Sequence, residues 1–193
     1  MEHLNIRNIH QFDCEELYKW VVFNAPNNSH FVEIGIAEGK SSGYLGVEII
    51  NSNKNIRLDC IDCWFMDTDT SKDYTETVRK NLTPIMDKMD IRIIQNYSRI
   101  ASKGYDNESL DFVFIDGDHS YNGVTNDIID WLPKLKNTGI IAGHDYNKDL
   151  YSHNVIKAVD DFFGKEIVNV SKNSWYVFIK DVDIKKHKKN SLI

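Results

Sequence analysis

Residues 31–42 read FVEIGIAEGKSS. A short apolar run ends in Glu33 and Gly35, and a new apolar periodicity begins after Gly39, which predicts a strand that turns sharply into a helix. Because glycine lacks a Cβ, Gly35 can adopt a positive φ and Gly39 can let a ligand approach the backbone. The unpaired amides of the first helical turn would point into the same loop. We therefore expect a small ligand to bind at this junction.

The spacing of the glycines does not match two common nucleotide-binding loops. A phosphate-binding P-loop has four residues between its first glycine and Gly-Lys, whereas only IAE separates Gly35 from Gly39. A dinucleotide fingerprint needs glycine where this chain has Ala37. The remaining pattern is ExGxxxG, in which Glu33 could accept hydrogen bonds from a hydroxyl or an ammonium group. A glycine turn without a ligand stays an alternative explanation of this loop.

Length and charge predict one domain that does not bind nucleic acid. The 193 residues carry a formal net charge of −6, and a nucleic-acid binder needs a clustered basic face. The one basic run, KKHKK, occupies residues 185–189. We expect a single domain over residues 1–184, with residues 1–29 as a helical lead-in, and a solvated basic tail over residues 185–193.

The cysteines and the apolar runs predict a protein of the cytoplasm. Cys14, Cys60 and Cys63 are odd in number and lack the spacing of zinc ligands, so neither a disulfide framework nor a metal ribbon is indicated. The first ten residues, MEHLNIRNIH, lack the apolar core of a secretion signal. No run approaches the roughly 18 apolar residues of a membrane span. We expect a reduced, soluble protein without a membrane partner.

Strands and helices alternate along the chain. Helices are expected over residues 13–25, 41–51, 70–89, 124–135 and 154–163, with a bend or break near Pro84. Strands are expected over residues 31–35, 56–62, 91–95, 110–116 and 138–142, followed by a hairpin of residues 166–170 and 175–179. This order predicts an α/β fold with a doubly wound, mostly parallel, Rossmann-like sheet, helices on both faces and a C-terminal antiparallel hairpin.

Polar residues follow the predicted strands at the edge where such sheets bind ligands. Asp62 ends the second strand, where a carboxylate can accept hydrogen bonds from both hydroxyls of a ribose. Trp64 could cover the face of an adenine ring or simply close the core. Ser98, after the third strand, could border the edge of the adenine or cap a helix.

The segment IDGDHSY, residues 115–121, is the densest polar cluster. A general base needs a pKa near the working pH. An unperturbed histidine such as His119 has one, whereas Asp118 would need burial or a neighbouring anion to raise its pKa. Either residue is therefore a candidate base. The alternative is an Asp-Gly turn that Asp118 caps, followed by a surface histidine.

The segment GHDY, residues 143–146, closes the next strand and should lie beside IDGD, because sequential parallel strands commonly pair. Asp116, His144 and Asp145 could then converge on a divalent ion, with magnesium or manganese favoured by the carboxylate oxygens. A hydrogen-bonded cluster that only orients a substrate is the alternative.

Taken together, FVEIGIAEGKSS, IDCW, the run from IDGDHSY to GHDY and the closing hairpin resemble the class I S-adenosylmethionine-dependent methyltransferases. Within that class they are similar to the small family that includes macrocin-type sugar O-methyltransferases. The resemblance runs from about residue 30 to residue 180, and its IDGDHSY and HDY segments are more specific than the glycine loop. It implies a methyl transfer from S-adenosylmethionine to a hydroxyl of a small molecule, with a sugar or glycan precursor as the family-level expectation.

The resemblance also implies roles for single residues. Expected contacts of the cofactor are Glu33, Gly35, Ala37 and Gly39 around its methionine part, Asp62 at its ribose, and Ser41, Trp64, Ser98 and Asp116. The metal-dependent members keep their ligands at Asp116, His144 and Asp145, and the sugar enzymes have their proposed base at Asp118. One departure is that those sugar enzymes have an acidic residue where this chain has His144, so the metal and its identity are left open.

The remaining expectations concern the acceptor, the partners and alternative functions. Acceptor specificity should rest on the N-terminal helix and on residues 64–74 and 146–153, while the scattered aromatic residues would suit a pocket or a homodimer contact equally. A cofactor-binding protein of the same fold without methyl transfer is one alternative function. A small NTPase, based on Gly39, Lys40 and Ser41, is the other.

Overall fold

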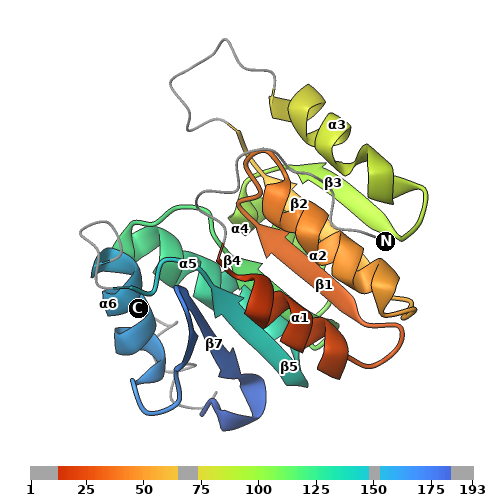
Figure 1. The fold of residues 1–193 in the computed structure, drawn as a ribbon. Helices are drawn as coiled ribbons and strands as arrows, with labels where there is room; N and C mark the ends of the chain where they lie inside the picture. The colour runs from red at the N-terminus through yellow and green to blue at the C-terminus, as the bar shows by residue number, and fades with distance from the viewer. Residues whose placement is uncertain (1–12, 65–73, 148–152, 184–193) are drawn as a thin grey trace.

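The computed structural model describes residues 13–64, 74–147 and 153–183 (Figure 1). In this part of the chain one seven-stranded sheet has the order β3-β2-β1-β4-β5-β7-β6. The strands are β1 (His30–Ile34), β2 (Arg57–Asp62), β3 (Ile91–Gln95), β4 (Leu110–Ile115), β5 (Leu135–Gly143), β6 (Asn169–Ser171) and β7 (Ser174–Phe178). The first five in this order run parallel, and β7 and β6 add an antiparallel hairpin at the edge. The predicted fold class is confirmed.

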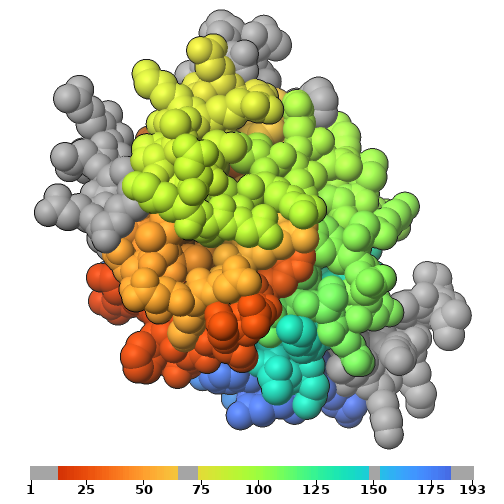
Figure 2. All heavy atoms as spheres, turned by 90° about the vertical axis from the view of Figure 1, so that its right-hand side faces the viewer, coloured from red at the N-terminus to blue at the C-terminus, as the bar shows by residue number. Residues whose placement is uncertain are grey.

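Helices cover both faces of the sheet. They are α1 (Glu15–Asn24), α2 (Lys40–Asn51), α3 (Tyr74–Met86), α4 (Ser98–Ala101), α5 (Tyr121–Trp131) and α6 (His153–Phe163), with 3-10 turns η1 (Ser102–Gly104), η2 (Leu132–Lys134) and η3 (Ile179–Asp181). On the face seen in Figure 2, α3, in yellow-green, lies over α2, in orange. None of the helices in the described ranges has the length and apolar character to cross a bilayer.

Several predicted boundaries shift for local reasons. Helix α5 begins at Tyr121 rather than at residue 124, because the Ser120 hydroxyl accepts a hydrogen bond from the amide of Gly123 and caps the helix. It ends at Trp131, since Pro133 cannot continue the hydrogen-bond ladder, and the chain tightens into η2 before β5. Helix α3 continues through Pro84, so the predicted break is not present. The short α4 was not predicted, and β6 is shorter than expected and begins three residues later.

The core has two halves, one on each face of the sheet, because side chains alternate along a strand. In β1, Phe31 joins the half beneath α1, α2 and α3, whereas Val32 and Ile34 join the half beneath α5 and α6. The same alternation turns Glu33 toward α1 and α2, where its side chain is fully buried. The alternation thus decides which strand residues can reach a ligand.

The strand order reverses between β1 and β4, and ligands of open α/β sheets bind at this kind of switch point. Backbone hydrogen bonds tie the carboxyl ends of three neighbouring strands together there. The amide of Gly35 donates to Ile61 O at 2.8 Å, and the amide of Asp116 donates to Ile34 O at 2.8 Å. The loops after β1, β2 and β4 are therefore held in one place.

A buried carboxylate organises the opposite end of the sheet. Asp59 accepts hydrogen bonds from Arg57 Nε at 2.9 Å and from the Tyr105 hydroxyl at 2.8 Å, and His30 Nε2 lies 2.9 Å from it. Burial alone would raise the pKa of Asp59, but these partners outweigh it and lower the pKa to about 2. The network sits far from the ligand edge and has a structural role.

We predict that this network makes the free energy of unfolding depend on pH below about pH 4. Because the pKa of Asp59 is lower in the folded than in the unfolded chain, its contribution is complete above about pH 4 and is lost as the pH falls toward 2. The loss amounts to about 2 kcal/mol. In urea unfolding of wild type and Asp59→Asn, the difference in the free energy of unfolding should shrink by this amount between pH 6 and pH 2. A difference that stays constant over that range would contradict the prediction.

Candidate functional site

A cavity of about 580 Å³ opens at the carboxyl ends of β1, β2, β3 and β4. Its wall consists of strand-end and loop residues together with residues of α3, α4 and α5; among them are Gly35, Ala37, Asp62, Trp64, Asn96, Ser98, Arg99, Asp116, Asp118 and Asp127. Cavities of 300 to 1,000 Å³ are typical of small-molecule sites. The cavity thus lies where the sequence predicted a ligand.

The loop after β1 packs directly on the loop after β4. Gly35 has a φ of 82°, and a Cβ on it would collide with the backbone carbonyl of Asp116, well inside 3.0 Å. Only glycine fits this position. Gly39 also has a positive φ, but a Cβ on it would face Leu82 and Val78 of α3 at 3.3 and 3.4 Å. Gly39 therefore contacts α3 and does not line the cavity.

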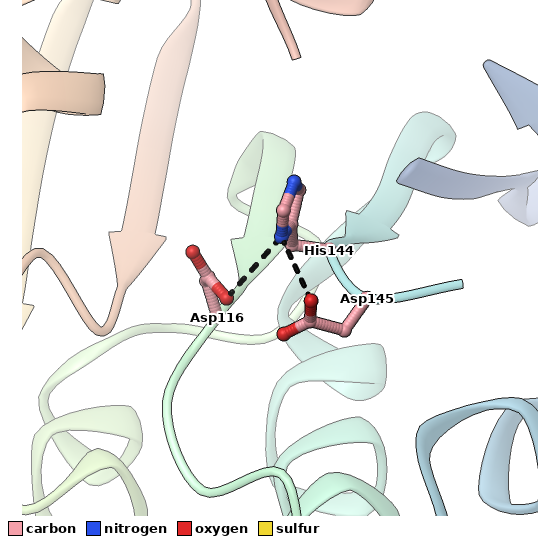
Figure 3. A group of neighbouring side chains, drawn as sticks. All are labelled: Asp116, His144 and Asp145. Atoms are coloured by element: carbon pink, nitrogen blue, oxygen red, sulfur yellow. Dashed lines mark ion pairs between the residues drawn. The ribbon is translucent and has the colours of Figure 1, made fainter. Parts of the chain in front are cut away.

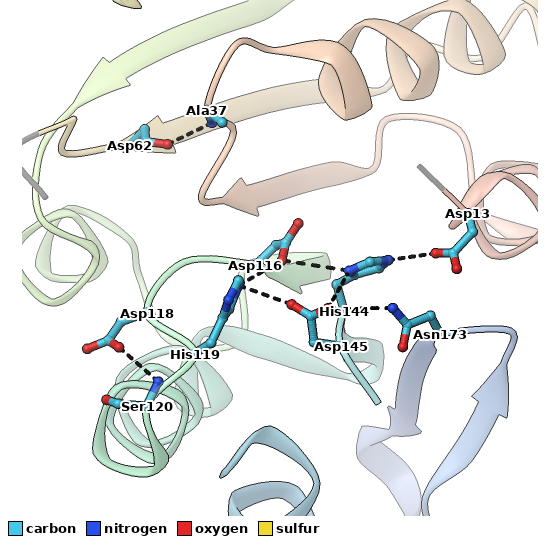
Figure 4. Close-up of polar contacts among 10 residues, drawn as sticks. All are labelled: Asp13, Ala37, Asp62, Asp116, Asp118, His119, Ser120, His144, Asp145 and Asn173. Atoms are coloured by element: carbon cyan, nitrogen blue, oxygen red, sulfur yellow. Dashed lines mark hydrogen bonds and ion pairs between the residues drawn. The ribbon is translucent and has the colours of Figure 1, made fainter. Parts of the chain in front are cut away.

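Asp62 links the loops after β1 and β2, and Figure 4 shows its hydrogen bond with Ala37 of the first loop. Its Oδ2 accepts a hydrogen bond from the amide of Ala37 at 2.8 Å, and its Oδ1 accepts one from the amide of Trp64 at 2.9 Å. The Trp64 indole donates to Ala37 O at 3.0 Å, which folds the ring over the loop. Each carboxylate oxygen keeps a lone pair that a ligand hydroxyl could use.

Glu33 lies beneath the loop and outside the cavity wall. The hydroxyls of Tyr18 and Ser42 donate to its carboxylate at 2.9 and 2.6 Å. Burial raises the pKa of Glu33, although hydrogen bonds from Ser41, Ser42 and Tyr18 oppose this shift. Of the residues expected around the cofactor, Glu33, Gly39 and Ser41 thus do not line the cavity. Ser41 bonds to the carboxylate of Glu33, and Gly39 contacts α3.

Asp116, His144 and Asp145 converge at the ends of β4 and β5, as Figure 3 shows. Each offers one donor atom, and these atoms lie within 4.8 Å of one another. His144 Nδ1 is 3.3 Å from Asp145 Oδ1 and 4.0 Å from Asp116 Oδ1. Pairing of β4 with β5 brings the two segments together, as the sequence predicted.

Three more residues complete the polar cluster in Figure 4. His119 Nε2 lies 3.2 Å from both Asp116 Oδ1 and Asp145 Oδ2. Asp13, just before α1, lies 2.6 Å from His144 Nε2, and Asn173, in the turn between β6 and β7, donates to Asp145 at 3.5 Å. Asp13 and Asn173 were not predicted, since nothing in their local sequence links them to residues 116–145.

The histidines and aspartates of this cluster lie close enough to shift one another's pKa values. Burial alone would lower the pKa of His144, but Asp145, Asp116 and Asp13 outweigh it and raise the pKa to about 9. The hydrogen bond from His144 lowers the pKa of Asp145, and the bond to Asp116 raises the pKa of His119. Burial raises the pKa of Asp116. Asp116 is the only one of these four that also lines the cavity, so it links the cluster to the ligand space.

The two candidate bases have different settings. Asp118 lines the cavity and accepts a hydrogen bond from the amide of Ser120 at 2.9 Å, so it caps the turn before α5. His119 is 48% exposed and bridges Asp116 and Asp145. Asp118 therefore lies on the cavity wall, whereas His119 lies beside it in sequence and contacts the wall residue Asp116.

Ser98 lines the far side of the cavity, next to a residue that sequence reasoning missed. Its hydroxyl donates to Asp127 Oδ1 at 2.5 Å and accepts a hydrogen bond from the Trp131 indole at 2.8 Å. Asp127 is buried in α5, and burial raises its pKa to about 6. A signal existed in the sequence, because an acid at this position interrupts the inward-facing stripe of the helix.

Comparison with known proteins identifies one matching family and several solved structures of similar fold. A family model described as a methyltransferase domain matches residues 32–146. A search of curated proteins by sequence finds no match.

Solved structures with a similar fold act on different molecules. The O-methyltransferase NovP has a TM-score of 0.62 and 16% identity, over 86% of this chain and 79% of NovP. CalS11, a TDP-rhamnose 3′-O-methyltransferase, has a TM-score of 0.60 and 11% identity, over 85% of this chain and 76% of CalS11. An rRNA methylase from Streptococcus thermophilus has a TM-score of 0.59 and 10% identity, over 88% of this chain and 96% of that one. Identities this low establish a shared fold and nothing about the acceptor.

Proposed function

The chain belongs to the methyltransferase-domain family of class I S-adenosylmethionine-dependent enzymes, and we propose that it methylates a hydroxyl group of a small molecule, with a sugar or glycan precursor as the acceptor class. One observation carries the proposal. Asp116 lies on the wall of the cavity and also belongs to the polar cluster. A hydroxyl held beside Asp116 would therefore face the cofactor space on one side and proton-accepting groups on the other.

The residues around the cavity fit S-adenosylmethionine. The volume of about 580 Å³ suits a ligand of that size, and Asp62 offers two carboxylate oxygens to the ribose hydroxyls. The chemistry of the bound cofactor is an activated methyl group on a sulfonium. The residues of the chain then have two tasks, which are to align the acceptor oxygen and to accept its proton.

The proton acceptor is proposed to be His119 or Asp118. His119 is positioned by Asp116 and Asp145 at 3.2 Å each, whereas Asp118 is directly on the cavity wall. An alcohol acceptor needs such a group more than a phenol does, because its hydroxyl is the weaker acid. Residues 65–73 and 148–152, where much of the acceptor specificity was expected, lie outside the described residues.

We propose that Asp116, His144 and Asp145 would hold a divalent ion, magnesium or manganese. The donor set fits, since it combines two carboxylates with one imidazole within 4.8 Å. Asp13 contacts Nε2 of His144, so Nδ1 faces the two carboxylates. A carboxylate on the second ring nitrogen, such as Asp13 here, is the usual outer partner of a histidine that binds a metal. A bound ion would lower the pKa of an acceptor hydroxyl.

The charge of the chain supports a small acceptor over RNA, although one structural neighbour is an rRNA-methylase. A net charge of −6 is unfavourable near a phosphate backbone. An NTPase function finds no support, because Lys40 pairs with Glu38 at 3.0 Å and Gly39 contacts α3. NovP and CalS11 support an O-methyl acceptor only as proteins of similar fold.

The test is transfer of labelled methyl from S-adenosylmethionine to a panel of free sugars, nucleotide-linked sugars, catechols and RNA, with manganese, magnesium or a chelator present. We expect label on the hydroxyl of a sugar-type acceptor and stimulation by one of the two ions. Label on RNA alone, or on a carbon or nitrogen atom, would refute the acceptor class. Equal turnover with and without the chelator would refute the metal.

We predict that Asp62→Ala weakens binding of S-adenosylhomocysteine by about 100-fold, because the variant loses charged hydrogen bonds to the ribose. Titration calorimetry measures the change. Asp87→Ala, an exposed acid between α3 and β3, is the matched control and should bind as the wild type does. Equal affinity of the two variants would show that the ribose does not lie at Asp62.

A further inference from the structure

Acidic groups outnumber basic ones around the polar cluster at the ends of β4 and β5. The carboxylates in the cluster, beside it in the chain or in the adjoining first turn of α1 are those of Asp13, Glu15, Glu16, Asp116, Asp118 and Asp145. The described cations near them are Lys172 and, when protonated, His119 and His144. Arg99 of the cavity wall lies in α4, after β3, and pairs with Asp130 at 3.8 Å. Six carboxylates therefore face at most three cations.

A divalent ion at the proposed metal site would reduce this excess without removing it. His144 has to be neutral to bind such an ion. Lys172, a protonated His119 and the ion together then supply four positive charges against the six carboxylates. The surroundings stay negative in either case, so they attract a cationic group on the acceptor and oppose an anionic one.

Two buried oxygen atoms next to the cluster indicate a bound molecule that donates hydrogen bonds. Asn173 Oδ1 and Ser174 Oγ are buried, and neither has a hydrogen-bond partner in the described ranges. Asn173 donates to Asp145 through its amide nitrogen. Ser174 shares its face of β7 with Tyr176, whose ring packs against Trp20 of α1. Buried acceptors without donors are unfavourable, and a donor-rich molecule beside Asp145 and α1 would satisfy them directly or through a water.

Lys172 shows that this part of the surface already holds one ammonium group. Its Nζ lies 3.5 Å from Glu15 and 3.4 Å from Glu16. The carboxylate of Asp13, just before this turn, contacts His144 with one oxygen, and its side chain is 41% exposed. Asp13 can therefore accept a further hydrogen bond from a molecule that approaches the cluster.

We propose that the acceptor is an amino sugar, whose ammonium group is held by Asp13 and the first turn of α1 while one of its hydroxyls lies beside Asp116. This inference rests on the proposed function. An ammonium group donates three hydrogen bonds and accepts none, so it suits carboxylate and amide oxygens. A phosphate group accepts hydrogen bonds and repeats the charge of the site, so phosphorylated and nucleotide-linked sugars are disfavoured.

Methyl transfer to matched sets of sugars tests the inference. Each set contains a hexosamine, the hexose of the same configuration, its 6-phosphate and its uridine-diphosphate form, in the gluco, galacto and manno series. Assays at about pH 7 keep the sugar amine mostly protonated, as an α-amino group is. We expect kcat/KM for the best hexosamine to exceed that for its hexose by about tenfold, with the phosphate-bearing sugars slowest. This ratio should fall between about 50 mM and about 500 mM sodium chloride, because salt screens the carboxylates.

Two variants should move the ratio in opposite directions. Glu15→Gln combined with Glu16→Gln removes two carboxylates and should lower it by about threefold, whereas Lys172→Gln frees both glutamates and should raise it by about twofold. These side chains are 32%, 68% and 44% exposed, so the substitutions leave the core intact. Damage to the fold would instead slow both sugars alike. Asp87→Asn, an exposed acid between α3 and β3, is the matched control and should keep the wild-type ratio.

The failures of the two proposals are distinguishable. If no sugar accepts the methyl group on oxygen, the proposed function fails and the inference falls with it. If a hexose or a phosphate-bearing sugar reacts as well as the hexosamine, or if neither variant changes the ratio, only the ammonium site is overturned.

Discussion

Gly35→Ala should unfold the protein or lower its free energy of unfolding by more than about 4 kcal/mol. Gly35 has a φ of 82°, which alanine adopts only with strain. The added Cβ would also meet the carbonyl oxygen and carbon of Asp116 and the amide nitrogen of Gly117, all inside 3.0 Å. These are backbone atoms of a loop that is tied to β1, so no flexible side chain can move aside.

Thermal and urea unfolding measure this effect, and the chain offers a matched control. Gly104, in η1, has no atom within 4 Å of an added Cβ. Gly104→Ala should therefore change the free energy of unfolding by less than about 0.5 kcal/mol. If both variants unfolded at the same midpoint, the loops after β1 and β4 would not touch as described.

Asp116→Asn should reduce methyl transfer by about 1,000-fold, within the range expected when a proton-transfer site is disabled. The substitution keeps the shape of the side chain but removes the anion that contacts His119 and neighbours His144. It also removes one carboxylate donor of the proposed metal site. Affinity for S-adenosylhomocysteine should change by less than about tenfold, because Asp62 and the glycine loop remain intact.

Single-turnover assays with labelled S-adenosylmethionine measure this loss, and calorimetry measures the affinity in parallel. Asp106→Asn, an exposed acid in the loop before β4, serves as the control and should keep wild-type turnover. Turnover of Asp116→Asn within tenfold of the wild type would contradict the role given to the cluster. A wild type that binds the cofactor but methylates none of the tested acceptors would favour a non-catalytic cofactor-binding protein.

The fold and the meeting of Asp116 with Asp145 could be predicted because they follow from order along the chain. Alternating strands and helices leave few topologies, and sequential parallel strands pair. Segments IDGD and GHDY each end a strand, so their proximity needed no knowledge of side chains. Asp13 and Asn173 could not be found this way, because they reach the cluster from α1 and from the terminal hairpin.

Glu33 shows a different limit. The sequence places it at the carboxyl end of β1, but which face of the sheet it occupies depends on how the helices pack. The structure turns it toward Tyr18 and Ser42, so it supports the loop from below. Asp127 is a further case, since the helical stripe of α5 places it on the inward face, but only the packing of α5 against Ser98 shows that it lies at the cavity.

A crystal structure of the protein with S-adenosylhomocysteine and manganese tests the central claim most directly. We expect the nucleoside in the cavity, with ribose hydroxyls within hydrogen-bond distance of Asp62 and the sulfur directed toward Asp116. Density for the nucleoside anywhere else, or with its ribose and Asp62 on different sides of the loop after β1, would contradict it.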